Sequence, residues 1–371
     1  MITRREFVVT LGAVGAHVGA GFSPPAHAQD DVAGLYDRSI VIDALANPGS
    51  MNVSWPPRGP LSQKQRDAIA ASGITAINVT VSADFEGSVR NIALWQGEVD
   101  RYPTLMSIVR RHSDIAKAKK ERTLGLMLGF QNTDMIERDL SRLDLFYRLG
   151  IRIIQLTYND RNLVGDGCLE PGNAGLSSFG RQVVERMNEL GIAVDLSHCG
   201  TQTTADGIAA STKPPLITHS GCREVFRHPR SKEDRELKAM ADKGGVVGIY
   251  FMPFIGPGRG APTVEMLLRQ IDHAIKTCGA DHVGIGSDLS VTPIEETPEY
   301  LREHQSFVDA RARRGISAPE ESRPLFIPEL NHPRRLEGVV RGMRQRKYST
   351  DVIEKVIGGN FHRVLKEIWT L

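Results

Sequence analysis

Eight short apolar segments recur along the chain and determine its predicted architecture. Each has the length of a strand and is almost continuously hydrophobic, which is typical of buried parallel strands because both of their faces are covered. The segments are residues 39–45, 74–81, 124–131, 151–158, 192–198, 215–220, 246–252 and 282–288. We therefore expect eight buried parallel strands.

The segments between these strands have helical spacing. Residues 177–190 are an example, because their apolar side chains, from Phe179 to Leu190, fall on one face of a helix. Glycine precedes four of the strands, where a helix ends and the next strand begins; these glycines are Gly73, Gly150, Gly191 and Gly245. Eight such units predict an α/β protein with a (β/α)8 TIM barrel. A doubly wound open sheet is the alternative, but no Gly-x-Gly-x-x-Gly follows the first strand.

Polar side chains gather at the carboxyl ends of the predicted strands. They are Asn47, Gln131, Tyr158, His198, His219 and Asp288. Barrel enzymes carry their chemistry on this rim. One polar residue there often only ends its strand, but two histidines and an aspartate at three strand ends predict a functional site.

The first 28 residues have the pattern of an export signal. Arg4 and Arg5 are followed by a weakly apolar, glycine-rich run over residues 8–22, and Ala26-His27-Ala28 gives a small-x-small cleavage site. The run is too short and too rich in glycine to span a bilayer comfortably. We predict a twin-arginine signal over residues 1–28, a periplasmic protein and no stable membrane span. An ordinary amphipathic N-terminal helix is the alternative.

Residues 29–371 are predicted to form one barrel domain. A polar stretch at 289–349, rich in Arg, Glu and Pro, is expected to wrap the barrel or cover its mouth, and residues 351–369 to form a closing helix. The chain has 46 basic and 44 acidic side chains, a balance that argues against a nucleic-acid partner. Its four cysteines include no Cys-x-x-Cys pair, so neither a disulfide scaffold nor a zinc knuckle is expected. The sequence leaves a homodimer open.

Several motifs resemble those of the renal (membrane) dipeptidase family, which consists of metal-dependent barrels of the amidohydrolase type. The matching segments are 151–159 (IRIIQLTYN), 175–180 (GLSSFG), 194–198 (VDLSH), 218–220 (THS), 228–230 (HPR), 284–288 (GIGSD) and 358–363 (GGNFHR). They occur in the family's order and extend over nearly the whole chain after the signal. The resemblance implies a two-zinc hydrolase barrel that acts on small peptide-like substrates.

Residue by residue, the resemblance carries over only half of the family's metal ligands. His198 and His219 match the two imidazoles that hold one metal, and Asp288 matches the carboxylate after the eighth strand. Leu45 and Asn47 replace a His-x-Asp pair after the first strand. Gln131 replaces the carboxylate that bridges the two metals. The resemblance therefore implies an atypical member of the family.

These replacements predict at most one zinc ion. Leucine cannot bind a metal, and amide oxygens are poor zinc ligands. Without a bridging carboxylate, two dications a few ångströms apart would repel strongly. The expected ligands of a single zinc are His198 and His219 together with Gln131 or Asp288. A site without metal is the alternative.

The resemblance also implies how a substrate is bound. Arg230 stands where the family clamps a carboxylate, and Tyr158 stands where better-known members place a histidine that polarises the scissile carbonyl. We expect Arg230, Tyr158 and Asn47 to bind the substrate. We expect hydrolysis of a dipeptide or an N-acyl amino acid, with Asp288 moving protons. One alternative is a lyase or isomerase that uses Asp288 or Tyr158 on an amino-acid-derived substrate. Another is a non-catalytic periplasmic binding or maturation factor.

Overall fold

The computed structural model describes residues 26–49 and 60–369. Most of the predicted export signal, residues 1–25, lies outside the described residues. Within the described residues, no helix is long and apolar enough to cross a membrane.

Eight parallel strands close into a ring. They are β1 (Ile42–Asp43), β3 (Ala76–Thr80), β5 (Leu124–Phe130), β6 (Ile151–Gln155), β7 (Ala193–Asp195), β8 (Leu216–Ser220), β9 (Val246–Ile249) and β10 (Val283–Ile285). The pairing runs β3-β1-β10-β9-β8-β7-β6-β5, and β5 pairs again with β3. All eight predicted segments supply a strand of this ring, which confirms the predicted TIM barrel.

Three further short strands were not predicted. β4 (Met106–Ile108) pairs with residues 124–126 at the start of β5, and β6 pairs with residues 128–130 of the same strand. β2 (Ala46–Asn47) and β11 (Leu289–Ser290) form a separate two-stranded parallel sheet beyond the ends of β1 and β10. This small sheet places Asn47 opposite Ser290 and continues two barrel strands past the rim.

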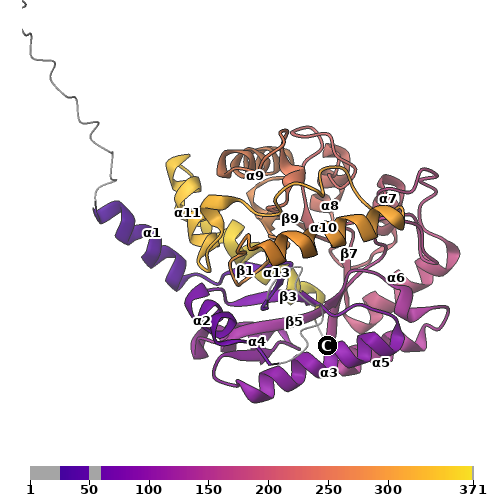
Figure 1. The fold of residues 1–371 in the computed structure, drawn as a ribbon. Coiled ribbons are helices and arrows are strands. Elements are labelled where there is room, and N and C mark those ends of the chain that lie inside the picture. The colour runs from indigo at the N-terminus through magenta and orange to yellow at the C-terminus, as the bar shows by residue number, and fades with distance from the viewer. Residues whose placement is uncertain (1–25, 50–59, 370–371) are drawn as a thin grey trace, which may run out of the picture.

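Helices surround the barrel (Figure 1). They are α1 (Ala26–Arg38), α2 (Gln63–Ser72), α3 (Phe85–Arg101), α4 (His112–Glu121), α5 (Ser141–Leu149), α6 (Ser178–Leu190), α7 (Thr201–Ala210), α8 (Asp234–Asp242), α9 (Val264–Cys278), α10 (Pro298–Arg313), α11 (Arg335–Gln345), α12 (Thr350–Glu354) and α13 (Asn360–Ile368). The sequence predicted α6 to within one residue. Its N-cap is Ser177, whose hydroxyl oxygen accepts a hydrogen bond from the backbone N–H of Gly180 at 2.9 Å.

The predicted closing helix is broken into three parts. A π-helical turn, Lys355–Gly359, separates α12 from α13. Gly358 presses on the first strand, where a Cβ atom would lie 2.3 Å from the carbonyl oxygen of Ile40. Beyond the turn, Phe361 and Val364 of α13 belong to a buried cluster with the first residues of several strands, including Ile42. The chain end therefore closes the amino-terminal end of the barrel.

The polar stretch 289–349 contains β11, α10 and α11. Helix α10, drawn in orange in Figure 1, contributes Phe307 and Arg311 to the lining of a cavity at the carboxyl ends of the strands. Helix α11 is anchored in the barrel by Arg335, whose guanidinium forms a buried ion pair with Asp43 at 2.9 Å. The stretch thus extends over the mouth of the barrel.

Candidate active site

A cavity of about 600 Å³ opens at the carboxyl ends of the strands. The strand ends contribute Asn47, Thr80, Ser82, Gln131, Tyr158, Asn159, His198, Arg230 and Asp288 to its lining. The polar stretch contributes Phe307, Arg311, Arg314, Glu321 and Leu325. Five of the six predicted rim residues therefore share one cavity. The sixth, His219, is fully buried directly behind His198.

The two histidines point their Nε2 atoms at each other. His198 follows the end of β7 and His219 lies within β8, and the two Nε2 atoms are 3.0 Å apart. The ring of Tyr158 stacks on His198 with 4.1 Å between ring centroids. The structure therefore brings together the two predicted imidazole ligands.

Hydrogen bonds fix which nitrogen of each imidazole carries the proton. His198 Nδ1 lies 2.6 Å from Asn159 Oδ1, and the Asn159 amide group donates to the carbonyl of Ile316, so its oxygen accepts from the imidazole. His219 Nδ1 lies 2.9 Å from Thr218 Oγ1. The Thr218 hydroxyl donates to the carboxylate of Asp195 at 2.6 Å and so also accepts from the imidazole. Both imidazoles are N–H donors at Nδ1.

It follows that both Nε2 atoms carry lone pairs. Burial lowers the pKa of both histidines well below the usual value, and the nearby Arg230 guanidinium lowers it further, so both rings are neutral. Two lone pairs 3.0 Å apart repel unless a cation lies between them. Zn–N bonds of about 2.0–2.1 Å would place two tetrahedral ligand nitrogens roughly 3.3 Å apart. The pair therefore fits a single metal ion, with the outer hydrogen bonds that metal-binding histidines typically make.

The other predicted ligands differ in how far they approach this pair. Gln131 Nε2 lies 3.4 Å from His219 Nε2, so rotation of this amide would present its oxygen to the same point. The carboxylate of Asp288 does not join the two imidazoles. In the described residues, no group of three His, Cys, Asp or Glu ligand atoms within 4.8 Å of one another includes them. The predicted set of two histidines and one carboxylate is not assembled here.

The residues at the first strand do not fit a second metal. Leu45 contributes an apolar side chain to the cavity wall. The side-chain oxygen of Asn47 is uncharged and accepts a hydrogen bond from the backbone N–H of Gly49 at 2.8 Å. A dinuclear site would need charged ligands at these positions. The first strand therefore offers no ligands for a second ion.

Asp288 lies in the loop between β10 and β11 with a left-handed backbone, at φ 60°. Its backbone N–H donates to the carbonyl of Leu45 at 2.8 Å and holds the turn. Burial raises the pKa of its carboxyl to about 7, although the Arg230 guanidinium acts in the opposite direction. A carboxyl group with such a pKa can both take up and release a proton near neutral pH.

Tyr158 is held by a pair of residues from the polar stretch. Arg311 donates from Nη1 to the phenol oxygen at 3.2 Å and forms a two-pronged ion pair with Glu321 at 2.8 and 2.9 Å. Burial raises the pKa of the Tyr158 phenol, so it keeps its proton. Because Arg311 occupies an acceptor position on the oxygen, the phenol proton remains as a donor toward the cavity.

Arg230 is a buried cation that opens onto the cavity. Its side chain is 2% exposed, and it donates to the backbone carbonyls of Ser197 and His219 at 2.6 and 3.3 Å. Within the described part of the chain, it forms no ion pair with a carboxylate. A buried charge without a counter-charge is costly, so this guanidinium is suited to an anionic ligand.

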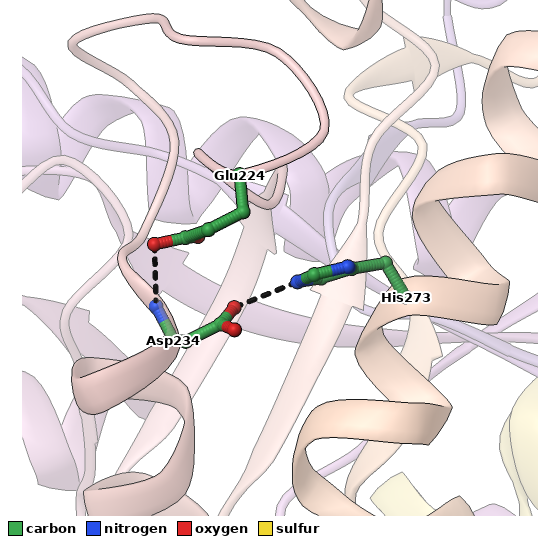
Figure 2. A group of neighbouring side chains, drawn as sticks. All are labelled: Glu224, Asp234 and His273. Atoms are coloured by element: carbon green, nitrogen blue, oxygen red, sulfur yellow. Dashed lines mark hydrogen bonds and ion pairs between the residues drawn. The ribbon is translucent and has the colours of Figure 1, made fainter.

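Another group of side chains could hold a cation, but it lies outside this cavity. Glu224, Asp234 and His273 converge between the β8–α8 loop and α9, as Figure 2 shows. His273 Nε2 lies 2.7 Å from Asp234 Oδ1, and Glu224 accepts from the backbone N–H of Asp234 at 3.3 Å. Glu224 is exposed, and these bonds already pair the three residues. None of them lines the cavity.

Sequence reasoning missed several residues of the site. Asn159 follows Tyr158 directly, and its place at a strand end was the available signal. Nothing in the sequence marked Arg311, Arg314 or Glu321 as site residues, because the polar stretch, including the helix α10, has the same pattern as an ordinary solvated surface. Only the folded chain brings that helix to the mouth of the barrel.

A closed parallel barrel with paired imidazoles in a cavity at the carboxyl ends of its strands has the architecture of a TIM-barrel enzyme. The model of the membrane dipeptidase family, peptidase family M19, matches residues 61–320. The chain belongs to this family.

The relatives agree with this assignment. An amidohydrolase structure from Pseudomonas aeruginosa is 32% identical, with 92% of this chain and 99% of that one covered and a TM-score of 0.79. The probable dipeptidase PvdM from the same organism has the same fold, with 19% identity, coverage of 93% and 99%, and a TM-score of 0.73. Dipeptidase tcpJ of Claviceps purpurea is 26% identical over 289 residues, which are 77% of this chain and 61% of tcpJ.

Proposed function

We propose that this protein hydrolyses dipeptides or N-acyl amino acids that carry a free carboxylate, and that it uses at most one metal ion. The observation that carries the proposal is Arg230, a buried guanidinium that faces the cavity and has no carboxylate partner among the residues the structure describes. A guanidinium presents two parallel donors that match a carboxylate. Membership of the membrane dipeptidase family supports the same class of reaction.

His198 and His219 would hold the metal through Nε2, with Gln131 beside them. A bound ion would polarise the scissile carbonyl or make water more acidic. The other steps depend on the chain's own side chains. Tyr158 keeps its proton and donates a hydrogen bond from its phenol to the oxygen of the scissile group. Asp288 takes up a proton from the attacking water and passes it to the leaving amine.

Metal content and turnover test this proposal together. We expect elemental analysis of the protein, purified from the compartment where it folds, to give no more than one zinc per chain, and L-Ala-L-Ala to be hydrolysed. Two tightly bound zinc ions would contradict the single-metal proposal. The triple variant Leu45→His, Asn47→Asp, Gln131→Glu should raise the content toward two if those positions are the reason.

Amidation of the peptide's carboxyl end is the matched control for the substrate. We expect L-Ala-L-Ala-amide to be a much poorer substrate, because it removes the anion that Arg230 would bind. Binding of both peptides with no turnover in the metal-loaded protein would instead favour a binding or maturation factor.

We also propose export by the twin-arginine route, which rests on Arg4-Arg5 and on Ala26-His27-Ala28. The double variant Arg4→Lys, Arg5→Lys should leave the precursor in the cytoplasm, as detected by fractionation and the mass of the mature chain. Normal export of this variant would contradict the proposal.

A further inference from the structure

The charged side chains that line the cavity do not balance. The lining contains Arg230, Arg311 and Arg314 but only two carboxyl groups, those of Asp288 and Glu321. Both oxygens of Glu321 are bound to Arg311, at 2.8 and 2.9 Å. The remaining cations, Arg230 in the interior and Arg314 at the mouth, therefore face the ligand space with Asp288 as the single remaining carboxyl.

The backbone of Arg314 is fixed by hydrogen bonds, whereas its guanidinium has no bonded partner in the part of the chain that the structure describes. It directly follows the last residue of α10, and its backbone N–H donates to the carbonyls of Ala310 and Arg311 at 3.3 and 3.1 Å. Over residues 26–49 and 60–369, its guanidinium takes part in neither an ion pair nor a side-chain hydrogen bond. Burial raises the pKa of Asp134, and the charge of Arg314 opposes this rise, but the two side chains do not come within 4.0 Å as an ion pair.

The cavity has room for a ligand that reaches from one arginine toward the other. Its volume of about 600 Å³ lies within the range of sites that bind drug-sized molecules. Met252, Phe254 and Leu325 supply an apolar part of the wall. This wall suits the hydrocarbon stem of a side chain, while the polar groups lie elsewhere in the lining.

We propose that the ligand carries a second carboxylate, which Arg314 recognises at the mouth while the C-terminal carboxylate lies at Arg230. The substrate class is then that of acidic dipeptides, or of N-acyl amino acids with an acidic acyl group. This inference rests on the proposed function, since it assumes that Arg230 binds the first carboxylate. Arg314 acts as a specificity-determining residue.

The test compares acidic peptides with amide peptides of the same shape. We would measure binding of L-Glu-L-Ala against L-Gln-L-Ala, and of L-Ala-L-Glu against L-Ala-L-Gln, by calorimetry. The wild-type protein should prefer the acidic member of at least one pair by about fivefold at low ionic strength, the upper range for an exposed ion pair. The preference should shrink as salt is added.

Two variants assign the preference to one side chain. In the Arg314→Gln variant, the acidic and the amide member of each pair should bind about equally. Arg313→Gln is the matched control and should keep the preference, because Arg313 is exposed like its neighbour Arg314 but does not line the cavity. Equal binding of both members of both pairs, or a preference that survives in Arg314→Gln, would overturn the inference.

Hydrolysis of the same four peptides separates this inference from the proposed function. A preference that depends on Arg314 without any turnover supports the inference and contradicts the hydrolase. Turnover at equal kcat/KM for acidic and amide peptides supports the hydrolase and contradicts the inference. If none of the peptides binds, both are wrong.

Discussion

The two sides of the cavity differ in what their buried aspartates support. On the imidazole side, formed by β7 and β8, Asp195 accepts four hydrogen bonds, from the backbone N–H and the hydroxyl groups of Ser197 and Thr218. Thr218 in turn holds the His219 ring. The other side is formed by β1, β2 and β10, and we call it the replaced side because Leu45 and Asn47 stand there in place of the family's metal ligands. Here Asp43 binds Ser287 and the guanidinium of Arg335.

The difference shows how one barrel can retain half of a metal site. On the imidazole side, the buried carboxylate still orients a residue that presents a lone pair to the cavity. On the replaced side, the rim residues are Leu45 and Asn47, and the buried carboxylate connects β1 to α11 instead. A buried aspartate at a strand end therefore has two uses here, one toward the site and one toward the fold.

The largest expected effect is on folding, at Asp43. Asp43→Asn would leave the Arg335 guanidinium, which is 2% exposed, buried without its counter-charge. Breaking a buried ion pair costs about 3–5 kcal/mol of unfolding free energy, which urea denaturation would measure. Asp195→Asn is the matched control. Asp195 has no cationic partner within residues 26–49 and 60–369, so this substitution should cost only about 1–3 kcal/mol. Equal losses would show that the two aspartates are not used differently.

Tyr158 lies between the two sides, stacked on His198 and hydrogen-bonded to Arg311. Tyr158→Phe keeps the ring and removes the donor that we place on the scissile oxygen. Loss of one such donor typically lowers kcat by about 100-fold. We expect kcat for L-Ala-L-Ala to fall by this order while KM and zinc content stay near the wild-type values. An equal fall in zinc content would mean that the ring supports the metal and the hydroxyl does not act on substrate.

Arg230 tests whether the imidazole side also binds the ligand's carboxylate. Arg230→Lys keeps the charge but loses the paired donors, so KM should rise by the equivalent of about 2 kcal/mol, the scale of a charge-assisted hydrogen bond. Amidation of the ligand should cost a similar amount. Because both changes remove the same contact, together they should cost little more than either alone. Full additivity would show that Arg230 does not touch the carboxylate.

The sequence predicted the barrel because each strand is buried on both faces and leaves a continuous apolar segment. It also placed His198, His219 and Asp288 at the rim, since parallel strands end at the same side. It did not predict β2 and β11, which are two residues long and depend on each other for pairing. Arg311 escaped prediction because its contact with Tyr158 joins residues far apart along the chain. Glu321 escaped prediction with it, because its ion pair with Arg311 gains a role only when Arg311 lies at the cavity.

The smallest expected effect compares outer hydrogen bonds on the two sides. Thr218→Val removes the oxygen that accepts from His219 Nδ1 and so frees the ring to take the other tautomer or rotate. Loss of such an outer partner weakens metal binding by at least about tenfold, which zinc titration with a competing chelator would measure. Asn47→Ala is the matched change on the replaced side, where the amide is bound to the backbone of Gly49 and not directed at a metal. It should leave zinc affinity within about threefold of the wild-type value, well below the loss expected for an outer metal-site partner. If Asn47→Ala weakened zinc binding as much as Thr218→Val, the replaced side would take part in holding the metal, and the division of the cavity into two functional halves would be wrong.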